Sequence, residues 1–187
     1  MRACPTRFKI AVIAATQLLL PIAFGVEEDP FWRDQNGKRE ANTESRSSKD
    51  GFGGCLLITA DADWKEKWDT SPDTIPRFKT TEMVGYGKTI YILIFFSNPL
   101  LTGRNECDVT CDIDITRPDG SASTHQVDAP AFRSELKGPA SNVYLSRAVI
   151  QFVGEKNDPP GKWKIQINLK DNHRHVQLPL SSSFTLK

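Results

Sequence analysis

Three histidines are the side chains of this chain best suited to bind a transition metal. His173 and His175 lie two residues apart near the C-terminus, and His125 is the third. Two imidazoles at this spacing on a strand share a face and can hold copper or zinc, with a third histidine completing the set. Lys170 and Arg174 add positive charge beside the pair, which disfavours a cation. We interpret the pair as exposed histidines beside a turn, with a metal site as the alternative, and expect no cofactor.

Thiols and carboxylates alternate over residues 107–115. In a strand, Cys107 and Cys111 share one face with apolar residues, while the aspartates of the segment point to the other face. The thiols and carboxylates therefore cannot surround one ion. The two cysteines lie roughly 13 Å apart along the strand, too far for a disulfide. We expect buried cysteines and a solvated row of aspartates, with a calcium site as the alternative. Cys55 can pair with Cys107 or Cys111, and the sequence leaves that choice open.

Two tryptophans are candidates for stacking a ligand. Trp64 and Trp68 lie four residues apart in a brief helix expected over residues 62–69, so they share one helix face. Such a pair most often packs on the core, and a stacking platform is the alternative. No nucleophile elbow or zinc-protease motif is present, and Gly85–Thr89 resembles a phosphate loop only in its last three residues. We assign no catalytic residue and predict that the protein is not an enzyme.

Period-two patterns separated by turn residues predict a mainly β fold. In the strand expected at residues 88–97, the side chains of both faces are apolar. This predicts a central strand that is covered on both sides. Seven or so short strands with regular turns favour an antiparallel immunoglobulin-like β-sandwich of about seven to eight strands, with one short helix near its N-terminal end. The other expected strands are 55–59, 78–84, 107–116, 121–127, 143–153, 162–170 and 173–186.

The last two expected strands form a hairpin whose pairing can be predicted. If Asp171-Asn172 is a two-residue turn, Ile167 pairs with Val176, Ile165 with Leu178 and Trp163 with Leu180. All six side chains are then apolar and lie on one face. Because Pro179 lacks a backbone donor, its strand is expected at an edge or at a bulge.

The N-terminus predicts export. A basic start, an uncharged apolar run over residues 10–22 and the small residues of Ala23-Phe24-Gly25 are typical of a signal peptide at residues 1–25. We expect a polar linker or disordered arm at residues 26–50 and one β-sandwich domain at residues 51–187. No later run is long enough to span a membrane, and Cys4 is lost with the signal. The predicted location is the periplasm or the extracellular medium.

Charge and composition limit the classes of molecule that the protein is expected to bind. The formal net charge is +1, with 24 basic and 23 acidic side chains, so there is no basic excess for binding nucleic acid. Hydrophobic residues make up 39% and charged residues 25%, as in an ordinary globular domain.

The folded part also resembles a family of uncharacterised bacterial secreted proteins. The residues that carry this resemblance span about 51–187 and include Phe52-Gly53-Gly54, Leu57-Ile58-Thr59, Ile75-Pro76, Cys107-Asp108, Arg117-Pro118-Asp119-Gly120-Ser121 and Gly161-Lys162-Trp163. The resemblance implies an exported or periplasmic β-sandwich and transfers no activity. Members of that family place a second cysteine just before the loop at residues 100–105, where this chain has Asn98-Pro99.

The functional expectation is a non-catalytic module that binds another extracytoplasmic protein. The Pro179 strand edge and an expected long loop at residues 128–140 are the candidate contact sites. The alternatives are a periplasmic module that binds a metal or a carbohydrate, and an enzyme of unrecognised type.

Overall fold

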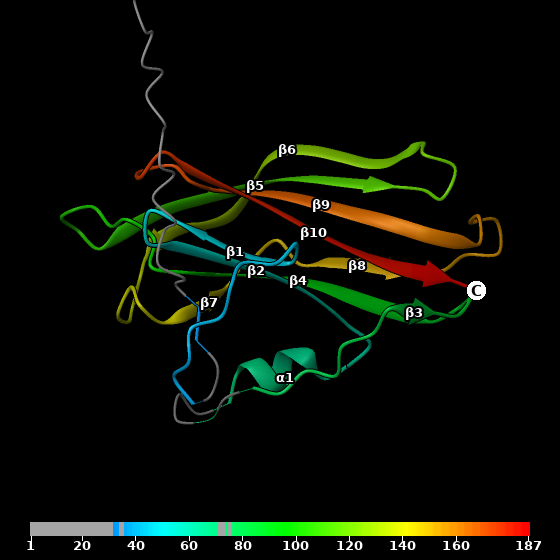
Figure 1. The fold of residues 1–187 in the computed structure, drawn as a ribbon, viewed down its shortest axis with the longest axis horizontal. Coiled ribbons are helices and arrows are strands. Elements are labelled where there is room, and N and C mark those ends of the chain that lie inside the picture. The colour runs from blue at the N-terminus through cyan, green and yellow to red at the C-terminus, as the bar shows by residue number, and fades with distance from the viewer. Residues whose placement is uncertain (1–31, 34–35, 71–73, 75) are drawn as a thin grey trace, which may run out of the picture.

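Two facing β-sheets and one short helix make up the described chain, as Figure 1 shows. The computed structural model describes residues 32–33, 36–70, 74 and 76–187, so the signal expected at residues 1–25 lies outside it. Within these residues the elements are β1 (Arg46–Lys49), β2 (Phe52–Thr59), α1 (Trp64–Trp68), β3 (Met83–Val84), β4 (Thr89–Ser97), β5 (Glu106–Thr116), β6 (Ala122–Glu135), β7 (Val143–Leu145), β8 (Ile150–Val153), β9 (Gly161–Asp171) and β10 (Val176–Leu186). The mainly β sandwich with one short helix is confirmed, although the described residues form ten strands rather than seven to eight.

The strand order leaves β2 and β10 near each other on one side of the sandwich. The first sheet runs β1-β2-β4, and both β7 and β8 pair with the far side of β4. The second sheet has the order β3-β10-β9-β5-β6. Every strand pair is antiparallel except β3 with β10, which is parallel.

The core is built from alternate residues of both sheets. On β9 the buried side chains are those of Trp163, Ile165, Ile167 and Leu169, and the residues between them face outward. A strand places successive side chains on opposite faces, so this pattern fixes which face of the second sheet meets the first. On β5, Cys107 and Cys111 are buried in the same core.

Strand β4 is buried on both faces, as its apolar sequence predicts. Its inward residues join the main core, while Leu93 and Phe95 point to the outer side and are also buried. The outer side is covered by α1 and the chain that follows it, where the Trp68 ring lies 5.3 Å from that of Phe95. The short helix is therefore held by packing on the sheet.

The predicted pairing of the last hairpin is wrong, although its face assignment is right. The turn contains four residues, 172–175, so Ile167 pairs with Leu180, Ile165 with Ser182 and Trp163 with Phe184. The register differs by four positions from the expected one, and an even shift keeps the apolar side chains on the same face.

Several expected boundaries also change. The linker expected to end at residue 50 contains β1, which pairs with β2 from Arg46 opposite Cys55 to Lys49 opposite Phe52. The expected strand at 143–153 is broken into β7 and β8, and the one at 78–84 is reduced to β3. In the described part of the chain, no helix is long and apolar enough to cross a membrane.

Candidate functional site

The three histidines are not brought together. His173 and His175 are exposed within the hairpin turn, and His175 adopts a φ of 58°. His125 lies on β6, where its Nδ1 is 2.6 Å from Asp114 on β5. Val109 on β5 pairs with Asp171 at the turn end of β9, and Asp114 lies five residues further along β5. His125 is therefore roughly 16 Å from the turn that contains the other two histidines. Among the described residues, no three histidine, cysteine or acidic side chains gather around a possible metal position.

The outward aspartates of β5 are engaged by cations and amides. Lys170 donates to Asp112 at 2.6 Å and to Asp128 at 2.8 Å, and Arg133 donates to Asp108 at 2.8 Å. Desolvation acts to raise the pKa of Asp112, but hydrogen bonds from Lys170 and its neighbours outweigh it and lower that pKa. With an ammonium group between two of the carboxylates, this face is a ladder of ion pairs and not a calcium site.

The three described cysteines are free thiols, so the predicted bridge from Cys55 to Cys107 or Cys111 is not formed. Gly54 faces the core, where an added Cβ would lie 2.9 Å from Leu169, and the next residue, Cys55, therefore points to the outer side of its sheet. The other two cysteines face the core from the opposite sheet. Burial raises the pKa of both Cys107 and Cys111 to about 11, so neither is a nucleophile at neutral pH.

The two tryptophans pack against the sheet. The Trp64 ring lies 5.9 Å from that of Tyr91, and Trp68 packs on Phe95, which also meets Phe78 at 5.9 Å. Both tryptophans are half-buried, and these ring contacts are tilted. The contacts agree with the interpretation that the pair packs on the sheet.

The two expected contact edges are partly blocked. Pro179 lies on the outer edge of β10, as expected, and its missing donor interrupts that edge. The long loop expected at residues 128–140 is mostly strand, because β6 continues to Glu135 through register shifts against β5. Bulges and prolines are the features that keep edge strands from pairing with other chains.

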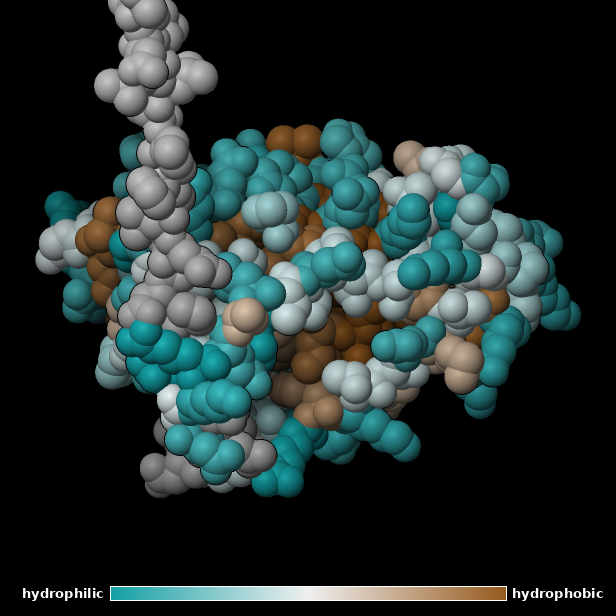
Figure 2. Space-filling model, viewed as in Figure 1, coloured by the Kyte–Doolittle hydropathy of each residue, from teal (hydrophilic) through white to brown (hydrophobic). Residues whose placement is uncertain are grey.

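A lateral hollow lies on the side of the sandwich where β2 and β10 face each other. It has a volume of about 1150 Å³ and is open to the surface. Its floor contains the buried residues Leu56, Ile58, Ile165 and Phe184, together with the inward-facing Ser182. Figure 2 shows hydrophobic residues near the middle of this face, with hydrophilic and neutral residues around them. An apolar floor under a polar rim is the usual composition of a small-molecule site.

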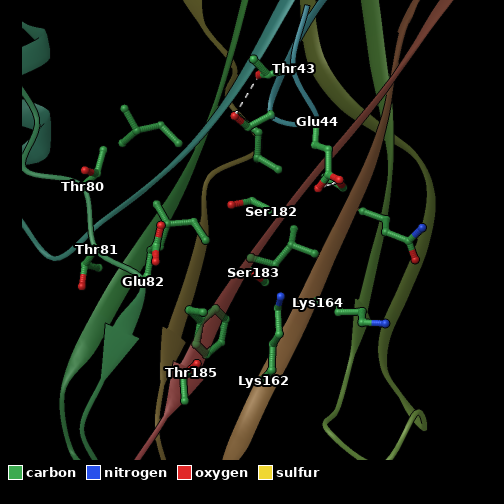
Figure 3. Close-up of a pocket in the computed structure, with 18 of the residues that line it drawn as sticks. Thr43, Glu44, Thr80, Thr81, Glu82, Lys162, Lys164, Ser182, Ser183 and Thr185 are labelled. Carbon is green, nitrogen blue, oxygen red and sulfur yellow. Dashed lines mark hydrogen bonds between the residues drawn. The ribbon is translucent and has the colours of Figure 1, made fainter.

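The rim of the lateral hollow carries charges of both signs. Glu44 and Glu82 contribute carboxylates, and Lys162 and Lys164 contribute amines. In Figure 3 the Lys162 side chain extends toward Ser183, while Lys164 points away from the middle of the hollow. All four side chains belong to exposed residues, and none forms an ion pair with another described residue.

The same hollow contains backbone groups that have no hydrogen-bond partner among the described residues. On β10, Ser181 N–H donates to Glu44 at 2.6 Å and Thr185 N–H donates to Glu82 at 2.8 Å. Ser183 lies between them and directs its N–H and C=O to the same side, where no described residue accepts or donates. The walls of the hollow can therefore form further hydrogen bonds with a bound molecule.

The second wall has the same property. On β2, Leu56 N–H donates to Ser45 at 2.7 Å and Ile58 C=O accepts from Thr81 at 3.1 Å. The remaining groups on that edge, Leu56 C=O and Ile58 N–H, have no backbone partner among the described residues. These two residues are only 3% and 5% exposed, and buried backbone groups are nearly always paired.

No local sequence pattern predicts the lateral hollow. Its residues come from five separate segments, and most of them are ordinary strand residues. The nearest signal is the run Ser181-Ser182-Ser183, which places a small polar side chain at an inward position between Leu180 and Phe184. A polar residue at a core position indicates a function or a local opening in the packing.

Comparisons with known proteins give no family. No family model matches the chain, and no curated protein matches it. Among solved structures, a family 123 glycoside hydrolase from Clostridium perfringens has a TM-score of 0.41 at 12% identity, covering 72% of this chain and 27% of that one. The chain thus spans about a quarter of that enzyme.

Two smaller solved structures are similar over most of their length. A CARDB domain from Pyrococcus furiosus, in complex with di-metal ions, has a TM-score of 0.38 at 10% identity, covering 79% of this chain and 99% of that one. A Niemann-Pick type C2 protein from the Japanese carpenter ant has a TM-score of 0.34 at 12% identity, covering 80% and 98%. Likenesses this distant support no argument about activity.

Proposed function

We propose that this protein is an exported, non-catalytic binding module whose ligand occupies the lateral hollow between β2 and β10. The observation that carries the proposal is the combination of an apolar floor with unpaired hydrogen-bonding groups on both walls. An apolar floor supplies binding free energy when a ligand buries it, and the polar groups around it fix the ligand's orientation.

Ligand binding in the hollow is favoured over strand pairing at a sheet edge. Pro179 interrupts the free part of the β10 edge, and Glu44 and Glu82 occupy backbone positions on either side of Ser183. Along β6, the shifts of register against β5 bend the other long edge. A compact ligand avoids both obstacles.

The test uses the uncharged fluorescent probe N-phenylnaphthylamine and a variant that fills the hollow. Ser182→Phe places a large ring on the floor, and Ser123→Phe adds the same ring on the exposed part of β6 as the matched control. We expect saturable probe binding that Ser182→Phe weakens by about tenfold or more, while Ser123→Phe leaves it unchanged. Circular dichroism shows that each variant is folded. Equal probe binding by all three folded proteins would overturn the proposed site.

Export is tested separately, on the chain produced with its own N-terminus. The basic, apolar and small residues of positions 1–25 predict cleavage after Gly25. We expect intact-mass analysis of the protein from a periplasmic extract to give a chain that starts at Val26. Recovery of the full-length chain from the cytosolic fraction alone would contradict export and would leave the binding site in place.

A further inference from the structure

We infer that the ligand of the lateral hollow is a short free peptide of about three residues, bound in an extended conformation beside β10. This inference rests on the proposed function and adds the chemical class of the ligand. Three observations carry it: the free backbone groups of the walls, the length between the closed ends and the mixed charge of the rim.

The backbone groups select a ligand that is itself made of amides. Ser183 offers one N–H and one C=O toward the hollow, and Leu56 C=O and Ile58 N–H face it from β2. An extended peptide presents donors and acceptors on both of its sides at the spacing of a strand. A fatty acid or another simple amphiphile would leave these groups unpaired, which costs free energy.

The length limits the peptide. Glu44 and Glu82 meet β10 at Ser181 and Thr185, four residues apart, which is roughly 13 Å along the strand. An extended tripeptide is about 10 Å long, whereas a longer chain would collide with the segments that close the ends. The site therefore excludes a strand that continues in both directions.

The charges of the rim fix the direction of the peptide. Glu44 lies at the Ser181 end. Glu82 and Lys162 both lie beside Thr185 at the other end, and the Lys162 side chain extends from there toward Ser183. An α-amino group beside Glu44 and an α-carboxylate beside Lys162 place the peptide parallel to β10. The neighbouring strand β3 also runs parallel to β10, so the bound peptide would continue its direction. A central apolar side chain would then contact the floor at Leu56, Ile58 and Phe184.

The test measures binding of the tripeptide Ala-Leu-Ala by calorimetry and by NMR of the backbone amides. We expect saturable binding, with the largest shifts at the amides of Ser183 and Ile58. N-acetylation removes the charge that faces Glu44, and C-amidation removes the charge that faces Lys162. Each change should weaken binding by about threefold to fivefold, as for an ion pair near the surface.

Variants of the protein show which side chain faces each charged end of the peptide. In Glu44→Gln, acetylation of the peptide should no longer matter, and in Lys162→Gln, amidation should no longer matter. Lys164→Gln is the matched control, because Lys164 points away from the middle of the hollow and should leave both preferences intact. A peptide N-methylated at its central amide tests the backbone pairing without altering the protein.

Three outcomes would overturn the inference. The first is that Ala-Leu-Ala does not bind. The second is that the free and the doubly capped peptides bind with equal affinity. The third is that dodecanoate binds tightly and that Lys162→Gln does not change its affinity. Each of them can occur while N-phenylnaphthylamine still binds and Ser182→Phe still blocks it. The class of ligand would then be wrong while the binding site stands.

Discussion

At the scale of single residues, His125 shows how the strand pairing decides a titration. The candidate metal ligand His125 lies opposite Asp114, and the hydrogen bond that its imidazole donates to that carboxylate raises the pKa of His125. A protonated imidazole forms a charge-assisted bond with a carboxylate, whereas a neutral one loses most of that attraction. The interaction of these two side chains between β5 and β6 therefore depends on pH.

We predict that His125 titrates above its ordinary pKa in the folded protein and that Asp114→Asn returns it toward that value. Because the folded pKa is raised, the stabilisation is complete below the unfolded pKa and is lost as the pH rises through the folded one. NMR titration of the imidazole C–H signals measures the shift. A His125 pKa that is the same in Asp114→Asn and in the parent protein would contradict the assignment.

The thiols give a second prediction at this scale. Cys107 and Cys111 are buried and have pKa values near 11, and burial also raises the pKa of Cys55. We expect slow reaction of all three with a thiol reagent in the native protein at neutral pH, and fast reaction after unfolding. Mass mapping of the alkylated chain checks both results. A Cys55 peptide linked to a Cys107 or Cys111 peptide would show the disulfide that the structure lacks.

At the scale of elements, one buried carboxylate joins three turns. Asp171 is 1% exposed and accepts hydrogen bonds from Leu100 N–H at 2.7 Å and from Arg174 Nε at 3.3 Å. Arg174 in turn donates to Asp50 C=O and to Asn98 C=O. The turns after β1, β4 and β9 are thus tied together at one end of the sandwich.

We predict that Asp171→Ala destabilises the protein by about 3 kcal/mol, because it leaves a partly buried guanidinium and a backbone N–H without their acceptor. Arg174→Lys should also destabilise, since an ammonium group cannot reach both carbonyls and the carboxylate. Urea denaturation measures both free energies of unfolding. Asp119→Ala, which alters an exposed turn, is the control, and an equal loss there would show that the network has no special role.

The same turn explains how far the sequence could predict this hairpin. Alternation predicted the shared face of the apolar side chains on the two strands, from Trp163 to Ile167 and from Val176 to Leu180, because a period of two depends only on local chemistry. It could not fix the register, since any even shift preserves the pattern. The actual turn places His175 in a left-handed backbone, a conformation that is uncommon for any residue other than glycine and that the two-residue turn did not require there.

At the scale of the whole molecule, the predictable part is the sandwich, and the unpredictable part is its open side. The doubly apolar strand β4 indicated a central, covered position, and the structure confirms it. The lateral hollow is instead lined by residues of separate segments, among them Ser45, Thr81 and Ser183. These residues lie far apart in the sequence, so no local pattern predicts the hollow.

The folded unit begins before Gly51, the residue at which the sequence analysis predicts its start. Strand β1 pairs with β2 along four residues and covers the edge beside Phe52, which is fully buried. The preceding segment bonds Ser45 to Leu56 and Glu44 to Ser181, so it also closes one end of the lateral hollow. A chain starting at Gly51 should therefore lose about 2 to 4 kcal/mol of stability relative to one starting at Asn36, from several lost hydrogen bonds of about 1 kcal/mol each.

Denaturation of the two purified chains provides the comparison, and a third chain starting at Val26 is the control for the residues before Asn36. We expect the chains from Val26 and Asn36 to unfold at similar urea concentrations, and the chain from Gly51 to unfold earlier. The shortest chain should also bind N-phenylnaphthylamine with a changed affinity, because its hollow is open at the Glu44 end. If the chain from Gly51 were as stable as the two longer chains, β1 would not contribute to stability and the folded unit would begin at Gly51.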